Sequence, residues 1–163
     1  MLRAFLFVLT VASLARAAAA QTVPAAKVAA SVVRLFGDGA RVDTVRVDSA
    51  AVLRVSRGDT LLGFARVGNV IGKDQPITFL VAIDPADRLK DVDILVYRES
   101  YGGEVAYEPW RRQFRGKSAA DSLRVGREIR SISGATISVQ AVTLGVKRML
   151  ADLTAWHRNG ALR

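Results

Sequence analysis

The sequence contains no cysteine and only one histidine, and both shortages narrow what the protein can do. A chain without cysteine forms no disulfides, binds no metal through thiolates, attaches no haem and has no cysteine nucleophile. A zinc site needs several ligands, and His157 stands alone beside the polar sequence Arg158-Asn159-Gly160. We therefore expect His157 to be solvated, predict no metal site and assign no catalytic residue.

The N-terminus has the three parts of a secretory signal peptide. Met1-Leu2-Arg3 is basic, residues 4–14 are apolar, and Ala18-Ala19-Ala20 provides a cleavage site of the A-x-A type. We predict cleavage after residue 20, which leaves residues 21–163 as one mature domain. An uncleaved membrane anchor and a buried N-terminal helix are the alternatives, although the apolar run is short for a membrane-spanning helix.

The formal net charge is +9 at pH 7, and most basic residues are interspersed with acidic ones. The exception is the cluster Arg111, Arg112, Arg115 and Lys117. A strongly basic chain suggests binding to nucleic acid or to an anionic membrane. Because an exported protein meets little nucleic acid, we predict no nucleic-acid partner and keep membrane-surface association as an alternative. We favour a solvated basic surface that helps an anionic cofactor to approach.

The apolar pattern and the turn signals predict a single α+β domain. Residues 61–71 and 76–83 are apolar and β-branched, and the turn sequence Gly72-Lys73-Asp74-Gln75 between them indicates an antiparallel hairpin. Residues 48–54 are ambiguous, with a short helix as one interpretation. The other expected elements are helices over residues 22–35, 118–123 and 135–156 and strands over residues 41–47 and 89–97. We therefore expect an antiparallel sheet with helices packed on one side.

A hydroxyl-rich turn, Ser131-Ile132-Ser133-Gly134-Ala135-Thr136-Ile137-Ser138, leads into a sequence of helical period. Ser131 and Ser133 are good N-cap candidates. The free N–H groups of the first helical turn and the helix dipole together form a natural phosphate site. Gly134 and Ala135 leave room for a bulky group, and Thr136 presents a hydroxyl to that site. The local physics alone favours an ordinary capped helix start.

The sequence Ser133-Gly134-Ala135-Thr136 resembles the S/T-G-A-T flavinylation motif of the FMN-binding domain family. This family includes the FMN-carrying subunits of the sodium-pumping NADH:quinone oxidoreductase and of Rnf-type complexes. Their motif threonine is esterified to the phosphate of FMN by an exported FAD:protein FMN transferase. The resemblance therefore implies covalent FMN on Thr136, flavin contacts from Ser133, Gly134 and Ala135, and that transferase as a partner.

The resemblance covers residues 60–150. Residues 70–77 and 81–84 are similar to a strand pair of the family, and residues 110–117 are similar to its W…Q-F…G-K stretch. Residues 98–104 occupy the position of the family's flavin loop, H/R-x-E-T-P-G-L-G. This loop departs from the family pattern because Ser100-Tyr101 replaces Thr-Pro. Family members often carry an acid shortly before the motif, and the closest acid here is Glu128.

The resemblance also implies which other residues contact the flavin. The loop residues are Glu99, Ser100, Tyr101, Gly102 and Gly103. The two glycines allow a positive φ or a close approach of the ring. Trp110 either shields the ring or anchors the core. Arg98 and Lys117 either pair with the phosphate or are ordinary surface cations.

These features predict an exported electron-transfer carrier with FMN esterified to Thr136, in the periplasm or at the extracytoplasmic face of the cell envelope. The transferase makes the ester, so this chain is its substrate and a carrier role is favoured over a stand-alone enzyme. Two alternatives remain: a non-covalent flavin- or ligand-binding module of the same fold, and a cofactor-free structural secreted domain.

We expect protein isolated from its native cell envelope to begin at Gln21, because signal peptidase cleaves after small residues such as those before it. Mass spectrometry of the N-terminal peptide measures the start of the mature chain. A protein that keeps Met1 and fractionates with the cytoplasm would contradict export.

Overall fold

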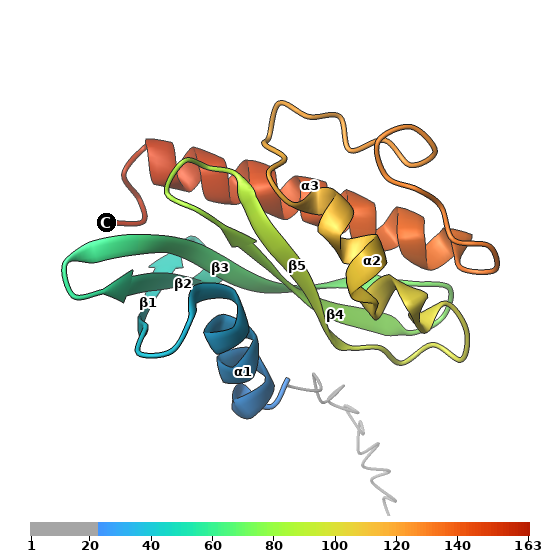
Figure 1. Cartoon of the computed structure of the whole chain (residues 1–163), viewed down its shortest axis with the longest axis horizontal. Coiled ribbons are helices and arrows are strands. Elements are labelled where there is room, and N and C mark those ends of the chain that lie inside the picture. Colours follow the sequence, from blue (N-terminus) through green and yellow to red (C-terminus); the bar gives the residue numbers. More distant parts are fainter. Residues whose placement is uncertain (1–22) are drawn as a thin grey trace, which may run out of the picture.

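The computed structural model describes residues 23–163, so the predicted signal peptide lies outside the described residues. Its centre is a five-stranded antiparallel sheet whose strands follow their order in the chain, β1-β2-β3-β4-β5 (Figure 1). The strands are β1 Arg41–Val47, β2 Ala50–Arg57, β3 Thr60–Ile71, β4 Pro76–Ile83 and β5 Leu89–Val96. The helices are α1 Ala25–Phe36, η1 Gly103–Ala106, α2 Glu108–Arg111, η2 Arg112–Phe114 and α3 Thr136–Arg158. The predicted α+β class is confirmed.

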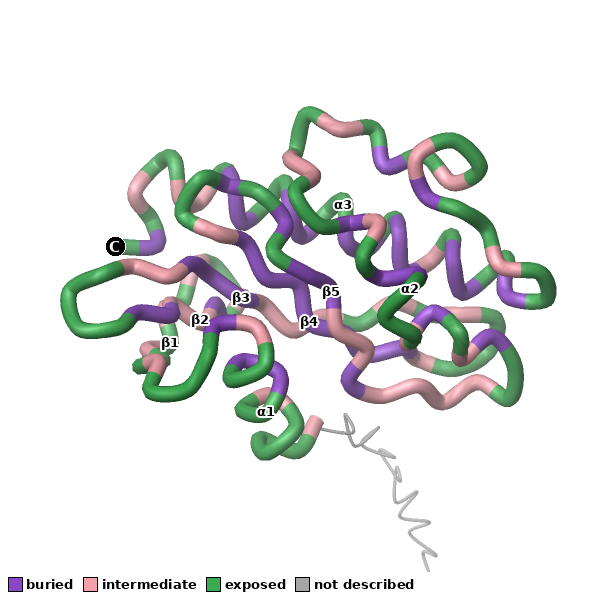
Figure 2. Tube along the Cα trace, viewed as in Figure 1, coloured by how far each residue is buried: buried purple, intermediate pink, exposed green. Residues whose placement is uncertain are grey.

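Strand β4 is buried on both faces of the sheet, from Ile77 to Ile83 (Figure 2). Phe79 and Val81 belong to one core, which includes the inner face of α3. Leu80 and Ala82 belong to a second core, on the opposite face, which includes residues of α1. The helices therefore cover both faces rather than the one side expected from the sequence. The reason is the continuous apolar run of β4, which leaves no face of this strand suited to solvent.

Helix α3 lies unusually close to the sheet. A Cβ atom at Gly145 would lie 2.6 Å from Cγ1 of Val70 and 2.7 Å from Cζ of Phe79. The missing side chain therefore allows the helix backbone to approach β3 and β4. This contact fixes the position of the helix and, with it, of its N-terminal end.

Two segments differ from the sequence expectation. The ambiguous residues 48–54 form a turn and then β2, because Asp48 adopts a φ of 53° and the chain reverses to pair with β1. Residues 118–123 do not form the expected short helix. Instead, the Asp121 carboxylate accepts hydrogen bonds from the Ser118 N–H at 2.7 Å and from the Ser118 hydroxyl at 2.8 Å. These bonds satisfy the groups that would have started a helix and hold a single turn.

A group of charged side chains joins α1, α2 and the residue after η2 to β5. Asp91 is only 2% exposed, and its Oδ2 atom lies 3.0 Å from Nη2 of Arg115 and 3.4 Å from Nη1 of Arg34. Arg111 is also buried and donates a hydrogen bond of 2.6 Å to the carbonyl of Val92. A buried carboxylate needs such partners because burial without them is costly. The segment that follows β5 is therefore fixed to the sheet.

The C-terminal end of α3 is tied to the turn between β4 and β5. Asp87 accepts a hydrogen bond of 2.8 Å from Nε of Arg158, and its other oxygen lies 2.7 Å from Nδ1 of His157. His157 also packs on Phe64, with 4.9 Å between the ring centroids, so it is not the solvated residue that the sequence suggested.

Within residues 23–163, no helix is long and apolar enough to cross a membrane.

The pKa of Asp87 is lowered from its usual value of 3.8. Burial alone would raise it, but the hydrogen bonds and charges of His157 and Arg158 outweigh the burial. A carboxyl with a lowered folded-state pKa stabilises the fold above its unfolded-state pKa. That stability is lost as the pH falls through the folded-state value.

We therefore expect Asp87→Asn to reduce the free energy of unfolding by about 2 kcal/mol at pH 6, because it removes a charged acceptor of two hydrogen bonds. The difference from wild type should shrink below pH 3.8, where the unfolded chain binds the proton. Urea unfolding at several pH values measures both effects. Asp59→Asn, in an exposed turn, is the control; an equal loss in both variants, or a loss that persists at low pH, would contradict the assignment.

Candidate functional site

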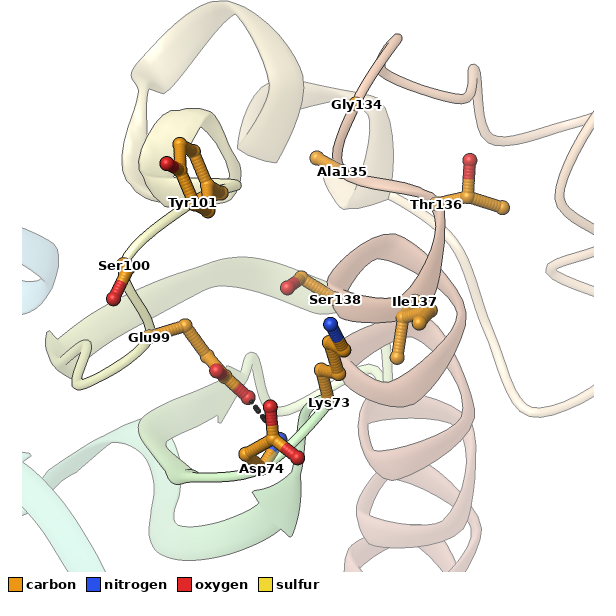
Figure 3. A pocket seen from close by; sticks show the side chains of 10 residues that line it. All are labelled: Lys73, Asp74, Glu99, Ser100, Tyr101, Gly134, Ala135, Thr136, Ile137 and Ser138. Atoms are coloured by element: carbon orange, nitrogen blue, oxygen red, sulfur yellow. Dashed lines mark hydrogen bonds between the residues drawn. The ribbon is translucent and has the colours of Figure 1, made fainter.

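A cavity of about 440 Å³ lies where three segments meet: the turn between β3 and β4, the loop after β5, and the start of α3 (Figure 3). This volume is within the range of small-molecule sites. The lining residues are Lys73, Asp74, Glu99, Ser100, Tyr101, Gly134, Ala135, Thr136, Ile137 and Ser138. The structure thus brings together two predicted groups, residues 99–101 and residues 134–136, that are distant in the sequence.

Helix α3 begins without a side-chain cap. Its N-cap position is Ala135, which makes no capping hydrogen bond, so the prediction that Ser131 or Ser133 caps the helix is wrong. The physical reason is Gly134, whose φ of 79° interrupts the helix before it reaches the serines. Because the first-turn N–H groups have no intrahelical acceptors, they remain available, and the helix dipole adds a partial positive charge beside the cavity. An anionic group is the natural ligand of such an end.

Thr136 is the first residue of α3 and is exposed. Its side chain points away from Lys73, Glu99 and Tyr101 in Figure 3, on the outer side of the helix start. A Cβ atom at the neighbouring Gly134 would meet nothing within 4 Å. The hydroxyl of Thr136 is therefore open to a bulky group that approaches from solvent.

Glu99 joins the loop after β5 to the turn between β3 and β4. Its Oε1 atom accepts hydrogen bonds from the backbone N–H groups of Gln75, at 2.9 Å, and Asp74, at 2.7 Å. These bonds lower the pKa of Glu99 below its usual value, so the group is a carboxylate at neutral pH. A Cβ atom at Gly72 would lie 2.5 Å from the same oxygen, so a side chain there would displace the Glu99 carboxylate. Glu99 shapes the cavity wall as well as lining it.

Lys73 is the one cation among the residues that line the cavity. In the view of Figure 3 its side chain lies between those of Glu99 and Ile137, with its nitrogen toward Ser138. Its positive charge and the α3 dipole favour a negative ligand group at the helix start, while Asp74 and Glu99 place carboxylates elsewhere in the lining. The sequence analysis did not assign Lys73, Asp74, Ile137 or Ser138 to the site. Lys73 and Asp74 lie in the turn at residues 72–75. The sequence pattern identifies this segment as a turn but does not show that it lines a cavity.

Gly102 lies directly behind the cavity and adopts a φ of 88°. A Cβ atom there would lie 2.7 Å from Oη of Tyr97, 3.1 Å from Oγ of Ser138 and 3.2 Å from Cβ of Ala135. Gly103 has no positive φ, and a Cβ atom there would make only ordinary contacts of 3.8 Å with the Tyr97 ring. The predicted need for glycine therefore rests on Gly102.

The remaining predicted residues are not among those that line the cavity. Trp110 is 5% exposed, donates a hydrogen bond of 2.9 Å to the carbonyl of Arg130 and contacts Phe114 edge-to-face, so it anchors the core. The Lys117 carbonyl accepts a bond of 2.7 Å from the N–H of Leu89. Ser133, Arg98 and Glu128 also lie outside the lining. Ser133 directly precedes Gly134, and Arg98 donates a hydrogen bond to the hydroxyl of Thr78. The Glu128 carboxylate accepts a hydrogen bond from the N–H of Leu123.

Comparison with known proteins identifies a family and a relative that this chain resembles. Residues 72–151 match the model of a family described as FMN-binding domain. The chain is 29% identical over 108 residues to a protein of Clostridium ljungdahlii that is named as a subunit of the proton-translocating ferredoxin:NAD(+) oxidoreductase complex. That alignment covers 61% of this chain and 58% of the relative, so the chain spans less than two thirds of the relative's length. The resemblance inferred from residues 133–136 is confirmed, and the matched segment contains the whole cavity lining.

We expect Gly102→Ala to lower the free energy of unfolding by about 2 kcal/mol, because alanine is strained at positive φ and its methyl group would press on Tyr97. Gly103→Ala is the matched control and should be nearly neutral. Thermal or urea unfolding of both variants measures the difference. Similar stabilities for the two variants would show that the backbone at Gly102 is not constrained as described.

Proposed function

Because residues 72–151 belong to the FMN-binding domain family, we propose that the protein is an exported flavoprotein that carries electrons, with FMN esterified to Thr136. The observation that carries this proposal is the start of α3. There an exposed threonine hydroxyl, an uncapped helix N-terminus and an open position at Gly134 adjoin the cavity.

The residues at the start of α3 fit the phosphate end of FMN. The first-turn N–H groups supply hydrogen-bond donors, and the helix dipole and Lys73 supply positive charge. Gly134 leaves space for the phosphate to approach the backbone. These groups would hold the phosphate of the cofactor whether or not the ester forms.

Among the hydroxyls near this helix start, Thr136 is the best suited to the ester. Ser138 is only 5% exposed and is hydrogen-bonded to Tyr97, so a transferase could not reach it. Ser133 precedes the left-handed Gly134 and lies outside the first helical turn. In the proposed reaction the Thr136 oxygen bonds to the FMN phosphorus of FAD. The pyrophosphate bond breaks, AMP leaves with the bonding electrons, and the hydroxyl proton is released.

The cavity walls would hold the ring end of the cofactor. The loop at residues 99–101 and the turn at residues 73–74 form these walls, and hydrogen bonds to Glu99 fix them to each other. Bound FMN supplies one- and two-electron transfer, which none of the protein side chains here provides. Tyr101 is 84% exposed at the rim, so a redox partner can approach the cavity closely.

The proposed partners are redox proteins of the cell envelope and the FAD:protein FMN transferase. The Clostridium relative is named as part of an oxidoreductase complex, which supports a carrier role over a stand-alone enzyme. Export to the periplasm or the extracytoplasmic face rests on the sequence of residues 1–20.

One observation favours a second candidate, a module that binds FMN without a covalent bond. The Thr136 side chain points away from the other cavity residues, whereas the uncapped helix end beside it would bind a phosphate directly. Denaturation separates the two candidates, because an esterified flavin stays with the precipitated protein and a non-covalent one is released.

We expect Thr136→Ala to abolish covalent flavin without unfolding the protein, since alanine is a good helix former at a first-turn position. Thr136→Ser should retain part of the attachment, and Ser133→Ala, the control, should retain all of it. The measurement is the intact mass of protein co-expressed with an exported transferase, followed by peptide mapping. FMN on another residue, or an alanine variant that stays covalently yellow, would refute the assignment.

A further inference from the structure

The Tyr97 hydroxyl connects two walls of the cavity. Tyr97 directly follows β5, and its hydroxyl donates a hydrogen bond to the carbonyl of Tyr101, in the loop after this strand. The same oxygen lies 2.8 Å from Oγ of Ser138, in the first turn of α3. Tyr101 and Ser138 both line the cavity, so one hydroxyl group fixes the distance between the loop and the helix.

The direction of these hydrogen bonds follows from the atoms involved. A carbonyl oxygen only accepts, so Tyr97 must give its single proton to Tyr101. The Tyr97 oxygen can then only accept from Ser138, and the Ser138 proton is committed to that bond. Ser138 is left with lone pairs alone to offer to the cavity.

The surroundings prevent these groups from rearranging. Ser138 is 5% exposed, and the Tyr97 ring packs against the main core. Gly102 leaves no spare volume, because a Cβ atom there would already lie 2.7 Å from the Tyr97 oxygen. At the other end of the loop, Glu99 holds the N–H groups of Asp74 and Gln75. The loop at residues 99–101 is therefore fixed at both ends.

We infer that Tyr97 is a positioning residue with two effects. It holds the Tyr101 wall against α3, and it makes Ser138 a hydrogen-bond acceptor for an N–H or O–H group of the ligand in the cavity. The second effect rests on the proposed function, because FMN carries such donors on its ring and on its ribityl chain. Ser138 thereby becomes a ligand-binding residue, and Tyr97 acts through it.

Tyr97→Phe is the direct test, because it keeps the ring and removes the hydroxyl. In the flavin-free protein, amide hydrogen exchange at residues 99–103 should quicken by about fivefold or more, since a hydrogen bond that closes the loop is lost. In the flavin-loaded protein, the visible spectrum and the reduction potential should shift. Tyr107→Phe, which alters a tyrosine that is 64% exposed, is the matched control and should change neither.

Ser138→Ala separates the two effects and serves if Tyr97→Phe does not fold. It should shift the potential by itself, and adding Tyr97→Phe to it should then shift the potential less than Tyr97→Phe does in the wild type, because the effect that passes through Ser138 is already lost. Hydrogen exchange of the loop should still quicken in the double variant.

The outcomes distinguish this inference from the proposed function. If Tyr97→Phe carries flavin with an unchanged potential, the acceptor role of Ser138 is wrong and the flavoprotein function stands. If loop exchange is also unchanged, Tyr97 has no positioning role. If wild-type protein takes up no FMN with or without the transferase, the proposed function fails, and the exchange measurement still decides whether Tyr97 positions the wall.

Discussion

The burial of β4 on both faces is the constraint on which the rest of the structure depends. Each large apolar side chain of this strand that is removed from water stabilises the fold by about 2 kcal/mol. Both faces of the strand must therefore be covered. Helix α3 covers one face and α1 covers the other. The close contact at Gly145 then fixes where α3 lies, and its N-terminal end comes to rest beside the turn and the loop that complete the cavity.

The cavity depends on polar contacts that the apolar core could not supply. Glu99 joins the loop to the turn between β3 and β4, and Tyr97 joins the same loop to α3. The uncapped helix end and Lys73 place positive charge in a lining that also holds the carboxylates of Asp74 and Glu99. Rigid walls and a fixed charge distribution would suit the proposed carrier, because they hold a redox cofactor in one environment.

The predictions from sequence succeeded where the local pattern and the tertiary structure agree. The hairpin around Gly72 and the long final helix have strong periodic signals and formed as expected. The caps at Ser131 and Ser133 failed because a positive φ at Gly134 moved the helix start, and no single-residue preference reveals that angle. The helix expected at residues 118–123 failed because the Asp121 side chain bonded the backbone in its place.

The sequence by itself determined the fold class and the resemblance to the FMN-binding domain family, because both are encoded in patterns of residues that are neighbours along the chain. It could not determine which residues share the cavity, since Lys73, Glu99 and Ser138 come together only when the sheet and α3 pack. Nor could it assign the hydrogen-bond direction at Ser138, which depends on Tyr97 and Tyr101 meeting one another across the loop. Those features arise from long-range packing, and therefore only the tertiary structure decided them.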